Sequence, residues 1–414
     1  MNTFGYTAPI FALPLELREQ IYRDVLSSTE QGSDLLRTCR DIYTEAQKFL
    51  YQRNINFCGQ SALFQWLDHV PAEFLSYVTQ ISLSVLDVDL SPLLKSKFEA
   101  YRSISPTRLH TWELYNREVE RLRAALEKLP RIQAITIRAL PGQRSYFYQE
   151  FLSKVLGMLS SLHSNLLDLR LGGNLNHQNL SFLSKLRRLQ SFSFNGISSS
   201  SPMEMAGILA SLDHLTHLSL VSQHGISECL LHHVSTTKQR SSSPDVIRTM
   251  EQLAPFFGTD RISASSPALA FTPEVLGAIH DHKTLNGLSI SLSQTPDLQT
   301  LGSLEEYLGK ASIEELELNW PDLDPDVLKQ FDLLPESLKH LCVRSRSNAD
   351  ASAMLCSIVD FQKAGGLLQL RTVVLVRSAQ SCKNSPSGRK DNEIGEAEVG
   401  DDVVSFQVHG EWKG

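Results

Sequence analysis

A spaced apolar triplet recurs nine times along the 414-residue chain: an aliphatic or Phe residue is followed at the third and fifth positions by two more. The clearest copies are LLDLRL, LQSFSF, LTHLSL, IEELEL and LKHLCV, which begin at residues 166, 189, 215, 313 and 338. Looser copies begin at residues 78, 132, 285 and 370. Polar residues separate the last two apolar positions in most copies, which is the alternation of a β-strand with one buried face.

Helix signals stand between these triplets. Residues 151–162 carry apolar side chains at helical spacing ahead of the copy at residue 166. Ser201 and Glu204 form the S-x-x-E capping box that opens a helix. Pro296 and Pro325 each take the first position of a predicted helix. The sequence therefore predicts a repeated unit of one helix and one short strand.

The triplet resembles the L-x-x-L-x-L strand of leucine-rich repeats, whose short strands stack in a solenoid that holds other proteins. Most steps between copies are 23 to 34 residues, and steps of 54 and 70 hold insertions. We predict an α/β fold, a degenerate leucine-rich-repeat solenoid over residues 70–378 with a helix and a short parallel strand per repeat. The alternative is a doubly wound α/β fold, whose strands are near-continuous apolar runs.

The insertions and the C-terminal end differ from the repeats. The first insertion carries a helical apolar pattern over residues 112–129, and the second holds a Ser-rich loop at 235–245 and a helix at 246–257. Residues 379–402 are polar and predict a disordered linker. Residues 403–414 predict a C-terminal strand or cap. Within them, VVSFQV is expected to pair with or cover the last repeat strand, because an open sheet edge needs covering.

Composition limits the expected partners and cellular location of the protein. The formal net charge is −7, so no nucleic-acid partner is expected. The sequence has no apolar run long enough for a membrane span and no signal-peptide pattern at its N-terminus. We therefore expect no membrane association and a location in the cytoplasm or nucleus. The cysteines show no C-x-x-C spacing, and we interpret several of them as reduced core thiols. They are Cys39, Cys58, Cys229, Cys342, Cys356 and Cys382.

The first residues do not follow the repeat. In FALPLELREQIYRDVL, Pro14 takes the first position of a helix with apolar residues on one face. A second helical apolar pattern runs over residues 35–50. The sequence predicts a small all-α module at residues 11–57, which is too small to stand well alone.

This module resembles the F-box in the variant common among fungal proteins. The segments LPLELREQIYRDVL, LLRTCRDIYTEA and FLYQRNINF carry the resemblance, through Leu13-Pro14, Glu16-Leu17, Ile21, Cys39-Arg40 and Tyr43. An F-box followed by leucine-rich repeats is a known domain order. The resemblance implies a substrate-recruiting subunit of a Skp–cullin-type ubiquitin ligase. The F-box would bind a Skp-family adaptor and, through it, a cullin, and the repeats would hold an unknown protein substrate.

The resemblance also implies an adaptor-binding surface made of apolar residues. Its members are Leu13, Pro14, Leu15, Leu17, Ile21 and Leu36. The alternative is a helical cap that closes the first repeat, because solenoids need capped ends. In that case the protein is a leucine-rich-repeat scaffold or regulator with no ubiquitin-ligase role.

The residues between the buried strand positions predict a second surface. Side chains alternate along a strand, so these residues point into the concave face of a solenoid. We expect that face to bind the substrate, with charged residues setting its orientation. The predicted residues are Arg138, Arg170, His217, Glu315, Glu317 and Arg344. The alternative is that partners bind the loops instead.

No sequence signature of catalysis occurs in the chain: G-x-S-x-G, the P-loop, G-x-G-x-x-G and H-E-x-x-H are all absent. The segment His280-Asp281-His282 has no partnered ligands nearby in the sequence, and we interpret it as a solvated loop. The sequence therefore predicts a binding protein rather than an enzyme, with no catalytic residues, no metal and no cofactor.

Overall fold

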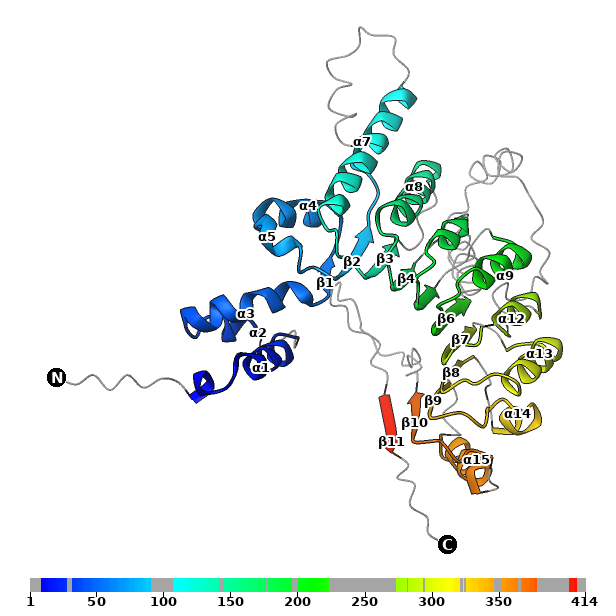
Figure 1. The fold of residues 1–414 in the computed structure, drawn as a ribbon. Helices are drawn as coiled ribbons and strands as arrows, with labels where there is room; N and C mark the ends of the chain where they lie inside the picture. The colour runs from blue at the N-terminus through cyan, green and yellow to red at the C-terminus, as the bar shows by residue number, and fades with distance from the viewer. Residues whose placement is uncertain are drawn as a thin grey trace, which may run out of the picture. The chain divides into compact units, whose positions relative to one another are not determined.

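The computed structural model describes residues 9–27, 32–90, 107–140, 145–173, 175, 178–195, 200–222, 273–280, 282–292, 295–320, 323, 325–345, 351–363, 366–377 and 402–407. The chain divides into two compact units, Met1–Gln190 and Ser191–Gly414. Helices alternate with short parallel strands in both, as Figure 1 shows. The predicted α/β class with one helix and one strand per repeat is thereby confirmed. The finer assignments to leucine-rich repeats and to an F-box stay predictions.

Unit 1 opens with a small helical module. It consists of the 3₁₀ turn η1 (Pro9–Ala12) and the helices α1 (Leu15–Ser27), α2 (Gly32–Leu35) and α3 (Arg40–Gln52). Its own core joins α1 to α3 through buried residues, namely Tyr22, Leu26, Ile42, Ala46 and Phe49. The expected position of Pro14 is wrong by one residue. Its carbonyl accepts the Arg18 N–H at 3.1 Å, so Pro14 is the cap that precedes α1.

The rest of unit 1 is a parallel sheet with connecting helices. The strands β1 (Ile55–Phe57), β2 (Gln80–Val85), β3 (Ala134–Ala139) and β4 (Asp168–Gly172) pair in chain order. The connections contain α4 (Gln60–His69), α5 (Ala72–Leu75), α7 (Thr107–Glu127) and α8 (Tyr146–Leu162), and η2 (Ser181–Lys185) follows β4. Helix α7 is the helix expected in the first insertion. Strand β1 was not predicted, because its residues were assigned to the helical module.

Unit 2 repeats the same plan. Its parallel strands are β5 (Ser191–Asn195), β6 (His217–Ser222), β7 (Gly287–Leu292), β8 (Glu315–Asn319), β9 (His340–Ser345) and β10 (Thr372–Arg377). Its helices are α9 (Pro202–Ala210), α12 (Pro273–His280), α13 (Leu298–Leu308), α14 (Pro325–Gln330) and α15 (Ala351–Lys363). Strand β11 (Asp402–Gln407) pairs antiparallel with β10. The expected pairing of VVSFQV with the last repeat strand is confirmed.

The apolar triplet explains why the strands stack. Each strand from β2 to β10 begins two residues after the first residue of a triplet. The central triplet residues of unit 2 lie in one continuous register and are all buried. This row consists of Phe192, Leu218, Leu288, Leu316, Leu341 and Val373. A buried Leu or Phe contributes roughly 1.5–3 kcal/mol, so each repeat is stabilised chiefly by contact with the next.

One local expectation is confirmed and another is wrong. The capping box of Ser201 and Glu204 is present at the start of α9. Pro296 is not the first residue of α13. The Asp297 carboxylate caps that helix by accepting the Thr300 N–H at 2.8 Å, an Asp being a better cap than a Pro.

The expectation that several cysteines are core thiols is not met among the four described ones, none of which is buried. Cys39, Cys58 and Cys356 are exposed, and Cys342 is half-buried. Cys39 is the cap that precedes α3, Cys58 lies in a bend after β1, and Cys356 takes an exposed position of α15. Cys229, Cys382, most of the second insertion and residues 379–401 of the expected linker lie outside the described residues, and Asp402 begins β11 instead of ending the linker.

Candidate protein-binding surfaces

The helical module exposes apolar side chains although it has a core of its own. We call this set the module surface. It consists of Leu13, Leu15, Leu17, Ile21, Val25 and Tyr43. In the described part of the chain, these six make up half of the twelve large apolar side chains that are exposed. Leu17 and Tyr43, from α1 and α3, are 49% and 50% exposed. A gathering of exposed apolar residues on so small a module is the usual mark of a protein-binding site.

Most of the predicted adaptor-binding residues belong to this surface. Leu13, Pro14, Leu15, Leu17 and Ile21 are exposed. Leu36 is half-buried and packs against the core of the module instead. The adaptor-binding residues predicted from the sequence did not include Val25 and Tyr43. Val25 stands one helical turn after Ile21, so helical spacing alone could have included it.

A half-buried polar clamp fixes the turn that carries Leu13 and Pro14. The Arg18 guanidinium donates to both carboxylate oxygens of Glu45 at 3.0 and 2.7 Å, and it also donates to the Leu13 carbonyl at 2.9 Å. The Tyr22 hydroxyl donates to Glu45 at 3.1 Å. Because Glu45 lies on α3, the clamp joins both helices to the turn. A bidentate Arg–carboxylate pair has a defined geometry, so it orients the module surface.

The clamp makes the module sensitive to acid. The hydrogen bonds from Arg18, with smaller ones from Tyr22, hold the pKa of Glu45 below its ordinary value of 4.5. A carboxyl with a lowered pKa stabilises the fold above its unfolded pKa, and that stabilisation is lost as the pH falls through the folded pKa. We expect Glu45→Gln to lower the protease resistance of residues 9–52 at pH 7. The gap to the parent chain should narrow as the pH falls below about 4.5 and continue to narrow through the lower folded pKa. A gap that is equal at pH 7 and pH 3.5 would contradict the role of the charge.

In unit 2, polar side chains are linked across the strand face opposite the helices. We call this set the open strand face, and it consists of His217, Ser289, Ser291, Glu315, Glu317, Asn319 and Arg344. Glu317 accepts from the Ser289 hydroxyl at 2.9 Å and from Arg344 Nε at 2.7 Å. The Asn319 amide donates to the Ser291 hydroxyl at 2.8 Å. Four of the predicted substrate-binding residues therefore lie together on this face, and Glu317 pairs with Arg344.

The small residue Gly287 allows His217 to reach across a strand. His217, Gly287 and Glu315 are in register on β6, β7 and β8. A Cβ on Gly287 would lie 2.5 Å from the His217 ring, so the imidazole occupies the space that a side chain would need. This places His217 Nε2 3.7 Å from a Glu315 carboxylate oxygen. The two groups form an ion pair when the imidazole is protonated.

The other two predicted residues, Arg138 and Arg170, belong to unit 1. Both are exposed and lie on neighbouring strands, β3 and β4. Arg170 pairs with Asp168 of its own strand at 3.0 Å. Sequence spacing alone could predict that these residues share a face with one another, but it could not identify their ion-pair partners.

Among the described residues, no group of three or more His, Cys, Asp or Glu side chains is placed to hold a metal ion. No helix in the described ranges is both long and apolar enough to cross a membrane.

Comparison with known proteins gives little further guidance. No protein-family model matches the chain, and no curated protein matches it. Among solved structures, the chain is similar to a structural-genomics target from Bacteroides fragilis, with 14% identity and a TM-score of 0.28. The match covers 57% of this chain and 64% of that one, so the chain spans less than two thirds of that protein. At this TM-score the likeness supports no conclusion.

Proposed function

We propose that the chain is a substrate-recruiting subunit of a Skp–cullin-type ubiquitin ligase. In this proposal the helical module is an F-box that binds a Skp-family adaptor, and the strand-and-helix repeats are degenerate leucine-rich repeats that bind a protein substrate. The chain itself carries out no catalytic step. Its task is to hold the substrate close to a ligase that the adaptor and a cullin assemble.

The observation that carries the proposal is the module surface. A cap that only closed the first repeat would turn its apolar residues inward and present polar ones to solvent. This module instead buries Tyr22 and Leu26 from one side of α1 and leaves Leu17, Ile21 and Val25 exposed on another. Exposed apolar residues on two helices, held in place by the Arg18–Glu45 clamp, suit a partner that buries a few apolar anchors.

The test is co-purification of the full chain with a co-expressed Skp-family adaptor. We expect the parent chain to recover the adaptor, and Leu13→Ala with Pro14→Ala to abolish recovery. Both residues are exposed, so the double variant should keep the far-UV spectrum and melting temperature of the parent. A matched control is Met203→Ala with Leu298→Ala, which shortens two exposed apolar residues of unit 2.

The outcome distinguishes an adaptor-binding module from a structural cap. If the parent chain does not bind the adaptor, or if the double variant binds it as well as the parent does, the module is a structural cap. The protein would then be a leucine-rich-repeat scaffold or regulator without a ubiquitin-ligase role.

A further inference from the structure

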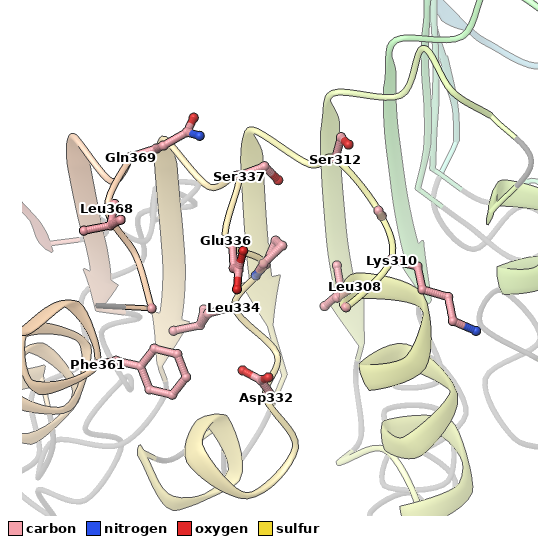
Figure 2. A pocket seen from close by; sticks show the side chains of 14 residues that line it. Leu308, Lys310, Ser312, Asp332, Leu334, Glu336, Ser337, Phe361, Leu368 and Gln369 are labelled. Carbon is pink, nitrogen blue, oxygen red and sulfur yellow. The ribbon is translucent and has the colours of Figure 1, made fainter. Parts of the chain in front are cut away.

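The loops that lead into β8, β9 and β10 enclose a groove in unit 2, shown in Figure 2. We call it the loop groove. It is formed by residues 308–312, 332, 334–337, 366, 368 and 369, together with Phe361 of α15. Its volume is about 710 Å³, within the roughly 300–1,000 Å³ of small-ligand sites. It therefore has room for several side chains of a bound peptide.

Apolar residues lie beneath the groove and at its edge. Leu308, Leu334 and Pro335 line the groove and are themselves buried, while Leu368 at its edge is 83% exposed. A Cβ on Gly366 would lie 2.8 Å from the Phe361 ring, so the missing side chain lets that ring lie against the loop. Leu368 and the half-buried Phe361 ring thus offer accessible apolar surface of the kind that holds an aliphatic or aromatic anchor.

Hydrogen bonds within and between the loops fix the walls. The Ala311 N–H donates to the Tyr307 carbonyl at 3.0 Å, and the Leu338 N–H donates to the Pro335 carbonyl at 3.0 Å. The Ser337 hydroxyl donates to the Ile313 carbonyl at 2.8 Å and so ties one loop to the next. A preformed groove binds a peptide at a lower entropic cost than mobile loops would.

The charges at the groove are acidic. Asp332 and Glu336 are exposed, and neither makes a hydrogen bond or ion pair with the described part of the chain. Lys310 pairs with Glu306 of α13 at 2.7 Å, and Figure 2 shows its side chain directed away from the two carboxylates. Helix α13 also ends at the groove, and a helix C-terminus carries partial negative charge.

We propose that the loop groove binds a short peptide segment in which a Lys or Arg side chain lies next to a bulky apolar side chain. The cation is recognised by Asp332 and Glu336, and the apolar side chain lies against Leu368 and the Phe361 ring. The proposal concerns unit 2 alone and does not depend on adaptor binding by the helical module. It assigns partner recognition to the loops in addition to the open strand face.

The test uses a phage-displayed library of random peptides against the immobilised full chain. We expect the selected sequences to be enriched in Lys or Arg within two positions of Leu, Ile, Phe or Met. A synthetic peptide of the most enriched sequence should bind more weakly as salt rises. Asp332→Asn with Glu336→Gln should weaken it about five- to tenfold, as expected for two partly exposed charge pairs. Leu368→Ser should also weaken it.

Matched variants show whether a loss of peptide affinity is specific to the loop groove. Asp213→Asn with Glu127→Gln removes two exposed carboxylates outside the groove and should leave peptide affinity within twofold of the parent. Leu13→Ala with Pro14→Ala should do the same even if adaptor binding is lost. The proposal is overturned if no peptide is enriched, if the enriched peptides lack a basic residue, or if the Asp332 and Glu336 variant binds the peptide like the parent.

Discussion

Gly173→Ala is expected to destabilise unit 1 by about 2–4 kcal/mol, because the added methyl group would clash with a neighbouring strand and alanine disfavours the backbone conformation of this position. Gly173 follows β4 with φ of 88°, in the region that glycine adopts far more readily than other residues. An added Cβ would lie 2.1 Å from the Ala139 carbonyl oxygen and 2.9 Å from its carbon. Both atoms belong to the backbone of β3, so relief requires the β3–β4 pairing itself to shift.

The neighbouring glycine supplies the control. A Cβ on Gly172 would meet no atom within 4 Å, and its φ is not positive. Gly172→Ala should therefore leave the stability within about 0.5 kcal/mol of the parent, as surface substitutions usually do. The measurement is the midpoint of thermal unfolding followed by circular dichroism, with hydrogen exchange of β3 and β4 to place the effect. Equal effects of the two variants would show that the turn after β4 does not need this conformation.

The strands were predictable because their signal is local and repeated. Each triplet contains the buried residues of one strand. Because side chains alternate between the two faces of a strand, a shift of one residue would expose these apolar residues, so the strand register is well defined. Nine copies with the same spacing support one another, so β2 to β10 could be placed, with each strand beginning two residues after the first residue of its triplet. Strand β1 could not, because Ile55–Phe57 offers too few residues to show alternation and follows a helix directly.

The sites were less predictable because their residues are distant in sequence. Arg18 and Glu45 are 27 positions apart, and only the packing of α1 on α3 brings them together. The loop groove takes residues from three successive helix-to-strand connections, none of which has a distinctive motif. Sequence spacing could identify the face on which Glu317 lies. It could not show that this carboxylate is already engaged by Ser289 and Arg344.

The second large effect is expected from Phe49→Ala in the core of the helical module. Phe49 is 3% exposed and packs with Tyr22, Leu26, Ile42 and Ala46. Arg23 and Lys48 also place their cationic groups 5.2 and 5.1 Å from its ring centroid. Removal of a buried Phe typically costs about 3–5 kcal/mol. A module this small has little stability to lose, so we expect α1 and α3 to open.

Tyr43→Ala is the matched variant, because it removes an aromatic ring from the exposed side of the same helix, α3. Limited proteolysis of the full chain should show rapid cleavage within residues 9–52 for Phe49→Ala and parent-like resistance for Tyr43→Ala. Under the proposed function both variants recover less adaptor, but only Phe49→Ala does so by unfolding the module. If Phe49→Ala resists protease as the parent does, the helices do not depend on this core. The exposed surface would then have to be explained without the rigid module on which adaptor binding rests.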